Sequence, residues 1–489
     1  MIHDYSQKTK PFEHQINAIT KISGIHPVAL FDEQGLGKTK MVIAALCDDL
    51  KNKYIQAALI VCKKTLLHTW QNEIKYHSYL NSVIISGNSN VRKRMFQTST
   101  EFYLINYETF ISEVDIVRYL LKAKKIAMVL DESHKIKNPE SKITKAILSV
   151  RDNAVKHIII SGTPIANSPE DLWAQFKFLD GGKLFGNDFD RFKERYEIKI
   201  HGGNSEFNEK RLLELQQKII SIAIRRTKEV AAPNLPIKKY TTIQCTMSPI
   251  QNEMYNKYKT ELLIEIKNMD GNTVIDENAS ILKKLTRLNQ IASNPYLIDK
   301  GYNETPTKFK ELDSLLEKIL ERKEKVIIWS NYIENIVILK NRYKHLSPLV
   351  IYGSINIERR DKYVNRFQNE SEYKILIANP SAAKEGLTLT AANNAVYLDR
   401  SFNIVDYLQS QDRIHRISQK KDCNIYLLMA KNSIDEYIDD VIYKKSEVAK
   451  FIQGDTKSIS FSKSVLTKEK LIYILGDNYD RKKCIEVKY

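Results

Sequence analysis

Residues 31–40, FDEQGLGKTK, constrain the fold more than any other part of the chain. They follow a short apolar run, residues 28–31, and precede residues 41–50, whose composition predicts a helix. A strand, a glycine-containing turn and a helix in this order are typical of a loop that binds phosphate, because the turn presents backbone N–H groups at the positive end of the helix. The sequence therefore predicts an α/β domain with a nucleotide-binding loop near its N-terminus.

The side chains of this loop suit a nucleoside triphosphate. Gly35 and Gly37 allow the backbone to curl around phosphate oxygens. Lys38 is expected to reach the outer phosphates, and the hydroxyl of Thr39 is expected to ligate Mg²⁺. The match is partial, because Asp32 stands where the full pattern has glycine.

An acidic pair follows a second apolar run. Residues 126–130, IAMVL, predict a buried strand, and DESHKIKN begins directly after it at Asp131. Asp131 is expected to hold magnesium, and Glu132 to orient and deprotonate the attacking water. A solvated strand end is the alternative interpretation, and the presence of Lys38 in the same chain favours the catalytic one.

A pair of arginines lies far from both motifs, in QSQDRIHRISQ at residues 409–419. Arg413 and Arg416 are three residues apart, so a helix would place both on one face. Two such guanidinium groups can stabilise charge on a transferring phosphoryl group. If they belong to a separate lobe, hydrolysis depends on its closure. A solvated basic helix is the alternative.

The charge balance favours a polyanionic partner. The 489 residues include 76 lysines and arginines against 59 acidic residues, a net charge of +17. Basic side chains bind phosphate backbones with release of counterions, which suits nucleic acid. A generally solvated basic surface would explain the same composition.

Cysteine usage and the terminal sequence bear on the compartment. The five cysteines lie far apart and form no CxxC or Cys/His cluster, so neither disulfides nor a zinc site is expected. The N-terminus lacks the order of a signal peptide, and no apolar run is long enough for a membrane span. We therefore expect no membrane association and a reducing location, which is cytoplasmic in a bacterium or for a virus-encoded protein, or nuclear in a eukaryote.

Strand-like runs occur in two groups. Five lie between residues 28 and 179 and five more follow residue 325, each alternating with helical stretches, which predicts two doubly wound α/β lobes. The region between them is charged and helix-forming apart from an extended segment at 233–249. We predict an N-terminal nucleotide-binding lobe at 1–180, a helical insertion and linker at 181–303, a C-terminal lobe at 304–453 and a basic tail at 454–489.

Together these motifs resemble helicase superfamily two, and more closely its SWI/SNF-type family of DNA-translocating ATPases. The resemblance covers most of residues 10–450 and extends into the region between the lobes, which separates it from general RNA helicases. Compact phage, viral and bacterial members are the most similar in organisation. The segments that carry it are DEQGLGKT, WQNE at 70–73, INYET at 105–109, DESHKIKN, SGTPIANSPEDLW at 161–173, RRTK at 225–228, LNQIASNPYLI ending at 298, and QSQDRIHRISQ.

The resemblance implies two RecA-like lobes that use ATP and Mg²⁺ and move along double-stranded or forked DNA. It assigns Gln15, with Phe12 near it, to adenine recognition. Ser161, Gly162 and Thr163 would couple nucleotide state to lobe movement, although a tight turn after a strand would give the same sequence.

One loop of the C-terminal lobe departs from the family pattern. Where many members have a glycine pair, this chain has Ala383 and Lys384, and only Gly386 remains to approach the nucleotide closely.

The resemblance also implies that the protein contacts DNA at its phosphate backbone. The DNA contacts are predicted at Lys63, Lys64, Thr65, Asn106, Ser330 and Arg360.

Two other functions remain open from the sequence. DESH is also a DExH-type box, so the chain could be an RNA helicase, and the altered loop around Lys384 could leave a nucleotide-gated DNA-binding scaffold without turnover. No zinc module or chromatin-reading domain is recognisable, so we expect a bare motor whose target is chosen by a protein partner or by DNA structure. Trp70, Trp173 and Trp329 are predicted to be core residues rather than platforms for base stacking.

Overall fold

The computed structural model describes residues 7–196, 205–267, 279–383 and 387–458, and Gly386 and Lys384 lie outside them. The chain divides into two compact units. The first contains the residues up to Leu235 and returns at Lys445, and the second runs from Pro236 to Lys444. Each unit is built on one parallel sheet.

The sheet of the first unit has seven parallel strands, in the order β3-β4-β2-β5-β6-β1-β7. Leu30, Ile160 and Asp131 are register partners at the carboxyl ends of three neighbouring strands. The loops that follow these strands therefore leave from one edge of the sheet, where ligands bind in open α/β folds. The strands are β1 (Val28–Leu30), β2 (Ala57–Cys62), β3 (Ser82–Ile84), β4 (Phe102–Asn106), β5 (Ile126–Asp131), β6 (Lys156–Ile160) and β7 (Ala223–Ile224).

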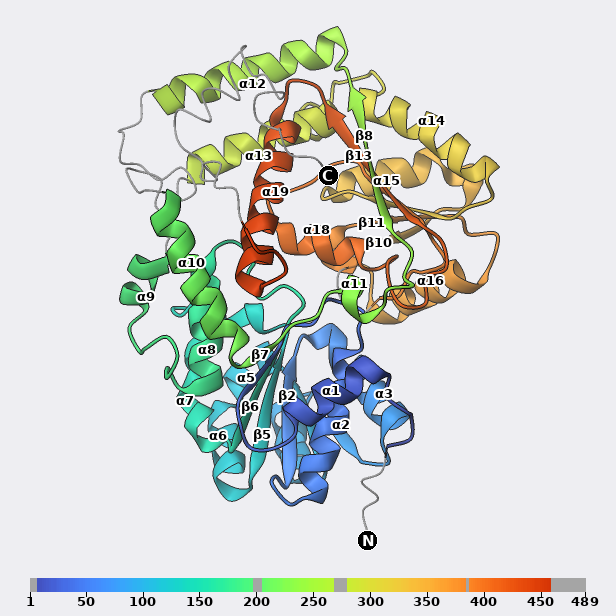
Figure 1. Cartoon of the computed structure of the whole chain (residues 1–489). Coiled ribbons are helices and arrows are strands. Elements are labelled where there is room, and N and C mark those ends of the chain that lie inside the picture. Colours follow the sequence, from blue (N-terminus) through green and yellow to red (C-terminus); the bar gives the residue numbers. More distant parts are fainter. Residues whose placement is uncertain (1–6, 197–204, 268–278, 384–386, 459–489) are drawn as a thin grey trace. The chain divides into compact units, whose positions relative to one another are not determined.

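Helices cover both faces of this sheet, because its central strands are apolar on both sides (Figure 1). One face packs on α1 (Glu13–Ile22), α2 (Lys38–Lys51) and α3 (Leu67–His77). The opposite face packs on the helices between β3 and β7. These are α4 (Ser89–Gln97), α5 (Tyr107–Ser112), α6 (Val114–Ala123), α7 (Lys142–Val150), α8 (Trp173–Asp180), α9 (Phe189–Tyr196) and α10 (Ser205–Ile220).

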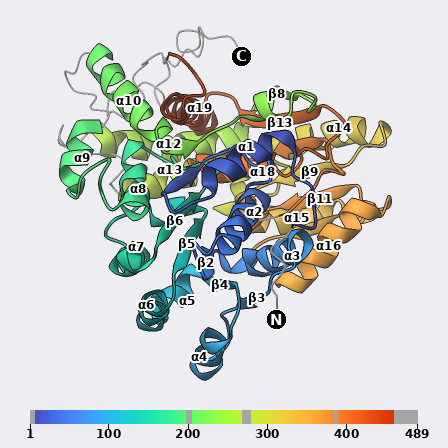
Figure 2. The same cartoon turned by 60° about the horizontal axis from the view of Figure 1, so that its bottom comes forward.

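The second unit repeats this plan with six parallel strands in the order β10-β11-β9-β12-β13-β8. Its strands are β8 (Lys238–Cys245), β9 (Val326–Trp329), β10 (Leu349–Ile351), β11 (Ile375–Ala378), β12 (Asn394–Tyr397) and β13 (Cys423–Ala430). Two apolar clusters, one on each face, form its core. The main helices are α14 (Thr307–Glu321), α15 (Ile333–Arg342), α16 (Ile357–Asn369) and α18 (Ile404–Gln411), seen from a second side in Figure 2. The short α17 (Pro380–Ala383) follows β11. The predicted pair of doubly wound α/β lobes is thus confirmed.

The region between the predicted lobes contributes to both sheets. β7 pairs with β1 in the first sheet, and β8, within the segment predicted to be extended, pairs with β13 in the second. The helical part consists of α11 (Lys228–Ala231), α12 (Pro249–Lys267) and α13 (Ala279–Ser293) in addition to α9 and α10. The sequence did not predict β7, because two residues are too short to show a strand pattern. The four-part division remains a prediction about functional modules.

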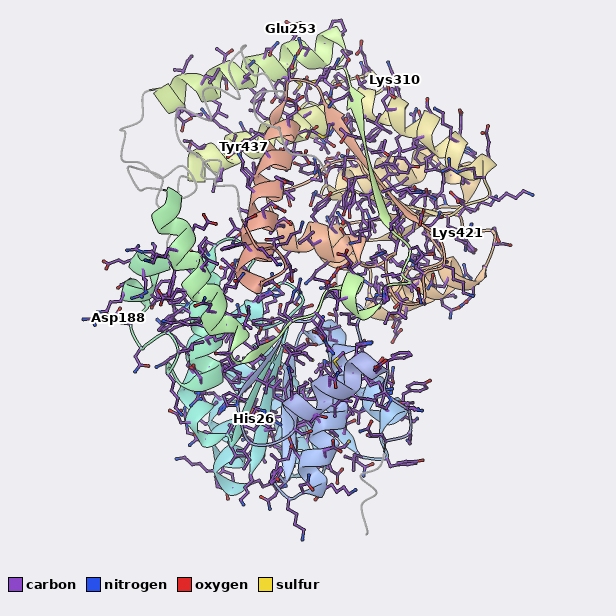
Figure 3. The ribbon with its side chains drawn as sticks, in the orientation of Figure 1. His26, Asp188, Glu253, Lys310, Lys421 and Tyr437 are labelled. Atoms are coloured by element: carbon purple, nitrogen blue, oxygen red, sulfur yellow. The ribbon has the colours of Figure 1, made fainter. Side chains whose placement is uncertain are left out.

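The last helix of the described residues, α19 (Ile434–Gln453), begins in the second unit and ends in the first. Near its start the buried Tyr437, labelled in Figure 3, belongs to the second unit. Near its end Phe451 and Ile452 are fully buried in the core cluster of the first unit. The first unit is therefore completed by residues that follow the second unit in the chain. Among the described residues, no helix has the length and apolar content needed to cross a membrane.

Candidate active site

The phosphate loop has the backbone that its glycines allow. Gly35 and Gly37 have φ of 90° and 83°, in the left-handed region that favours glycine, and α2 begins directly after them at Lys38. A Cβ atom on Gly37 would collide with the side-chain nitrogen of Gln15. The predicted strand–turn–helix is confirmed, and α2 starts three residues before the predicted helix because the loop closes into it.

Lys38 is partly buried, and its side chain folds back onto the loop. Its Nζ donates hydrogen bonds to the backbone oxygens of Asp32 (2.7 Å) and Glu33 (3.1 Å). Burial lowers the pKa of Lys38 to about 8, against the opposing charges of Asp32 and the acidic pair. The side chain is still charged at neutral pH, and the phosphates of a nucleotide would stabilise that charge further.

Asp32, which departs from the full glycine pattern, is fully buried and forms an ion pair with Arg226. The same guanidinium donates to the backbone oxygen of His14 at the start of α1. Beside it the Glu33 carboxylate accepts from the backbone N–H of Lys228 (2.7 Å). The RRTK segment therefore supports the loop from the side, and this explains why a carboxylate is accommodated at position 32.

Gln15 lies against the loop, as its predicted role in nucleotide recognition requires. Its Nε2 donates to the backbone oxygen of Leu36 (3.2 Å), and its Oε1 accepts from the backbone N–H of Phe12 (3.0 Å). The Phe12 ring is 58% exposed and stacks on His14 at a centroid distance of 6.0 Å. Phe12 thus offers an exposed aromatic face, while Gln15, only 2% exposed, mainly holds α1 to the loop.

Asp131 ends β5 in the same row of the sheet as Leu30. One carboxylate oxygen accepts from Nε1 of Trp70 (2.8 Å), and the other from the backbone N–H of Glu132 (2.9 Å). The Tyr107 hydroxyl donates to the backbone oxygen of Asp131 (2.8 Å). Burial and the charge of Glu132 raise the pKa of Asp131 to about 6, so the group is ionised at neutral pH.

These donors leave lone pairs on both oxygens of Asp131, since a carboxylate has about four acceptor positions. Carboxylate and hydroxyl oxygens are hard ligands, and Mg²⁺ is usually bound by one or two carboxylates together with the phosphates of its substrate. Asp131 and the Thr39 hydroxyl, in the first turn of α2, therefore fit a magnesium ion carried in with a nucleotide.

Glu132 has a strained backbone, with φ and ψ both at 53° in the left-handed region. Strain of this kind is found where a side chain must be aimed in one direction. Its carboxylate lies 3.3 Å from Nδ1 of His134. Burial works against ionisation, but the hydrogen bond and charge of His134, with the charges of two lysines, lower the pKa of Glu132 to about 2. The lysines are Lys63 and Lys38.

The segment after β6 adjoins this pair. The Ser161 hydroxyl lies 3.5 Å from Nδ1 of His134 and accepts from the backbone N–H of Thr163 (3.1 Å). Gly162 packs so closely on Gln34 of the phosphate loop that a Cβ atom would be only 2.5 Å from its side chain. The segment therefore contacts the loop directly through Gly162 and reaches Glu132 through His134. The role of these residues in coupling remains a prediction.

The prediction that Arg413 and Arg416 share a helix is wrong. α18 ends at Gln411, and both arginines lie in the non-helical turns that follow. They nevertheless reach a common segment, since Arg413 donates to the backbone oxygen of Leu387 (3.1 Å) and Arg416 to the hydroxyl of Thr388 (2.5 Å). The turns after α18, rather than a helix, therefore direct both guanidinium groups to this segment.

The residues predicted to contact DNA differ in exposure. Lys64 is exposed and Thr65 is partly exposed, whereas Lys63 is only 5% exposed and its charge acts on Glu132. Asn106 caps α5 by accepting from the backbone N–H of Thr109 (2.8 Å).

The two contacts predicted in the second unit are engaged inside the protein. Ser330 is fully buried and donates to Asp399 (2.6 Å). Arg360 donates to the backbone oxygens of Ala382 (3.0 Å) and Ile355 (3.3 Å). The structure thus favours structural roles for the side chains of Ser330 and Arg360.

Four residues at the site were not assigned a role from the sequence: Trp70, Tyr107, His134 and Arg226. Three of them stand in the motifs WQNE, INYET and RRTK, and His134 stands in DESH. The motifs were thus recognisable, but which partner each side chain binds depends on the fold. Trp70, Trp173 and Trp329 are all buried, as predicted.

A phosphate loop and an acidic pair at one edge of a parallel sheet, followed by a second parallel-sheet unit, define the class of helicase-like nucleotide-binding cores. The family described as SNF2-related domain matches residues 15–297, and the helicase conserved C-terminal domain matches residues 307–418. The chain belongs to the SNF2-related family.

Its relatives include an uncharacterized ATP-dependent helicase of Mycoplasma genitalium, 29% identical over 90% of this chain, and the human DNA repair and recombination protein RAD54-like, 26% identical over 95%. The chain spans 41% of the length of the first and 68% of the second. Among solved structures, the SWI2/SNF2 ATPase core of Sulfolobus solfataricus in complex with double-stranded DNA is 26% identical, covers 92% of this chain and 94% of its own, and has a TM-score of 0.45.

Proposed function

We propose that this protein is a DNA-dependent ATPase that uses hydrolysis to move along double-stranded or forked DNA. The observation that carries the proposal is the meeting of Lys38 with Asp131 and Glu132 at one sheet edge, close enough for both carboxylates to act on the pKa of the lysine. Membership of the SNF2-related family supports it, as do relatives named as an ATP-dependent helicase and as a DNA repair protein.

In the proposed reaction, the loop amides and Lys38 bind the triphosphate, and Thr39 and Asp131 hold Mg²⁺. A bound Mg²⁺ would neutralise the negative charge that develops on the phosphates. Glu132 is aimed by its left-handed backbone and by His134, and it orients the attacking water and accepts its proton. Arg413 and Arg416 are proposed to stabilise the charge on the transferring phosphoryl group.

Movement on DNA is proposed to follow from coupling within the first unit. Ser161 touches His134 beside Glu132, and Gly162 packs on Gln34 of the phosphate loop. A change at the γ-phosphate would therefore reach the segment after β6 through two direct contacts. Contacts with DNA are proposed to fall on phosphates through basic residues such as Lys64, so sequence preference should be weak and salt dependence steep.

Targeting is proposed to come from a protein partner or from DNA structure, in the cytoplasm or nucleus where DNA is held. Neither the RNA helicase nor the scaffold alternative is favoured by a contact described above. Both are outcomes of the same assay.

The test is steady-state ATP hydrolysis without nucleic acid and with duplex DNA, forked DNA, single-stranded DNA and RNA. The proposal predicts that duplex or forked DNA strongly stimulates phosphate release by the wild-type protein. With the Glu132→Gln protein on the same DNA, phosphate release should be lost although ATP still binds. A triplex-displacement assay on duplex DNA then tests movement itself.

Each other outcome counts against the proposal. Stimulation by RNA alone would identify an RNA helicase. Nucleotide binding without turnover on any substrate would identify a scaffold. Stimulated hydrolysis without triplex displacement would leave a DNA-dependent ATPase that does not translocate.

A further inference from the structure

Phe31, the last residue before the phosphate loop, is held at both of its backbone polar groups by the segment around β7. Its N–H donates to the oxygen of Ile224 (2.8 Å), and its oxygen accepts from a guanidinium nitrogen of Arg225 (2.6 Å). The first bond belongs to the edge of the sheet. The second depends on one side chain, so the start of the loop is fixed partly by where Arg225 points.

Arg225 is in turn held by a residue from the end of the described chain. Its Nε and a second guanidinium nitrogen donate to the two carboxylate oxygens of Asp455, at 2.9 and 2.5 Å. The side chains are only 14% and 10% exposed. A bidentate pair of this kind is among the strongest hydrogen-bonding arrangements in proteins and fixes the plane of the guanidinium group.

The turn that presents Asp455 is well defined. Phe451 and Ile452 of α19 are fully buried in the core of the first unit, and the backbone oxygen of Phe451 accepts from the side chain of Gln216. Gly454 then has φ of 82°, which reverses the chain direction, and a Cβ atom there would lie 3.1 Å from Ile220. Asp455 is therefore positioned beside Arg225 by the buried end of α19 and by the turn at Gly454.

These contacts join the two places where the chain passes between the units. Arg225 precedes the crossing at Leu235 and Pro236, and Asp455 follows the return at Lys444 and Lys445. Both residues belong to the first unit. The outgoing and returning segments are thus fastened to each other and to Phe31 through one guanidinium group.

We infer that Arg225 and Asp455 are positioning residues for the nucleotide site, and that they make the geometry of the phosphate loop depend on the docking of the segment that returns from the second unit. Neither residue is placed on the reacting atoms. The inference deepens the proposed function, because it names a route by which the returning segment acts on ATP binding, but ATP binding can be measured whether or not DNA stimulates hydrolysis.

The primary experiment compares Asp455→Asn with the full-length wild-type protein. Asparagine keeps the size and one acceptor but loses the charge, so the fork of Arg225 is no longer held at both nitrogens. The affinity for a fluorescent ATP analogue with Mg²⁺ is expected to fall about tenfold, as for loss of a charged hydrogen bond. The KM for ATP should rise in parallel while kcat changes by less than a factor of about two, since the loop binds ATP in both ground and transition states.

Matched variants separate positioning from a general loss of stability. Glu214→Gln breaks another arginine–carboxylate pair of the first unit, with Arg195, that lies in α9 and α10 away from the loop. Asp455→Glu restores the carboxylate and should recover most of the affinity. Arg225→Gln should lower the affinity for ATP further, because the bond to Phe31 is also removed. If the two residues act through the same pair, adding Asp455→Asn to Arg225→Gln should cause no further loss of affinity.

The inference would be overturned if Asp455→Asn had the ATP affinity and KM of the wild-type protein, even if its melting temperature were lower. Additive losses in the double variant would also overturn it, since Asp455 would then act by another route. A wild-type protein that binds ATP but shows no DNA-stimulated turnover would count against the proposed function, and the binding comparison would still decide the inference.

Discussion

Asp131 and Asp399 occupy similar places in the two units but differ in their surroundings. Each lies at the carboxyl end of a strand inside a parallel sheet, Asp131 at the end of β5 and Asp399 two residues after β12. Asp131 accepts one hydrogen bond at each oxygen. Asp399, 2% exposed, accepts five, from Ser293, Ser330, Asn335 and both nitrogens of Asn331.

The difference shows how a fold separates a reactive carboxylate from a structural one. A carboxylate with about four acceptor positions has none left for a metal when five donors surround it. Asp131 keeps room for a cation, and the left-handed Glu132 lies beside it. The environment of an acidic strand end, rather than its position in the sheet, therefore distinguishes the proposed catalytic carboxylate from the structural one.

The largest expected effect is on turnover in the first unit. Glu132→Gln removes the group proposed to accept a proton from water, so kcat should fall about a thousandfold or more. Affinity for ATP should remain within a few-fold of wild type, as measured with a fluorescent ATP analogue. Robust hydrolysis by this variant would remove the distinction drawn between the two carboxylates.

The next effect is on stability in the second unit. Asp399→Ala leaves several buried donors without their acceptor, and the free energy of unfolding should fall by about 3 kcal/mol or more. Trp329 is the tryptophan of the second unit, so its fluorescence during urea unfolding, in a Trp70→Phe Trp173→Phe background, reports on that unit.

Asp361→Ala is the control for this loss, since Asp361 is exposed on α16 of the same unit and a surface change should cost less than about 0.5 kcal/mol. Equal unfolding midpoints for the two variants would show that the Asp399 network contributes no net stability.

A smaller effect is expected at the support of Asp131. Trp70→Phe keeps most of the buried volume but removes the N–H that orients the carboxylate, so the Mg²⁺ concentration required for hydrolysis should rise about tenfold to a hundredfold. The KM for ATP at saturating Mg²⁺ should change little.

Trp173→Phe is a matched control, because the indole N–H of Trp173 has no hydrogen-bond partner among the described residues. If both variants shift the Mg²⁺ requirement equally, the bond from Trp70 does not orient the ligand.

The smallest effect concerns pH. Lys38 has a pKa lowered to about 8 by burial, so it is charged at pH 7 and loses its proton as the pH rises through 8. Affinity for ATP should therefore fall with rising pH, by at most about tenfold per unit above the pKa. Binding titrations between pH 7 and 9.5 measure it. Lys38→Arg should show no such decline, because arginine stays charged throughout, and a flat wild-type profile would contradict the argument.

Most of the fold could be predicted because apolar strand runs are local features. The run IAMVL became β5, and the other strand-like runs of the first group became β2, β3, β4 and β6. The five runs after residue 325 became β9 to β13. β7 could not be predicted from the sequence because it is a strand only through its pairing with β1.

The candidate site divides in the same way. Lys38 and the acidic pair could be predicted as candidates because the pattern that indicates them lies in adjacent residues. The bond from Trp70 to Asp131 and the pairing of Arg225 with Asp455 join residues far apart in the chain, so no local pattern reveals them. The resemblance assigned Ser330 to DNA, whereas its hydroxyl donates to Asp399, 69 residues away in the chain.

The return of α19 to the first unit has a consequence for synthesis. A ribosome makes residues 236–444, which carry the sheet of the second unit, before it makes Val448, Ala449, Phe451 and Ile452, which fill the core of the first. The N-terminal unit, although translated first, is therefore the last to have all of its core residues. A nascent chain reaches a complete nucleotide-binding unit only when translation has passed residue 455, and any chain interrupted earlier carries the ATP-binding motifs without the packing that supports them.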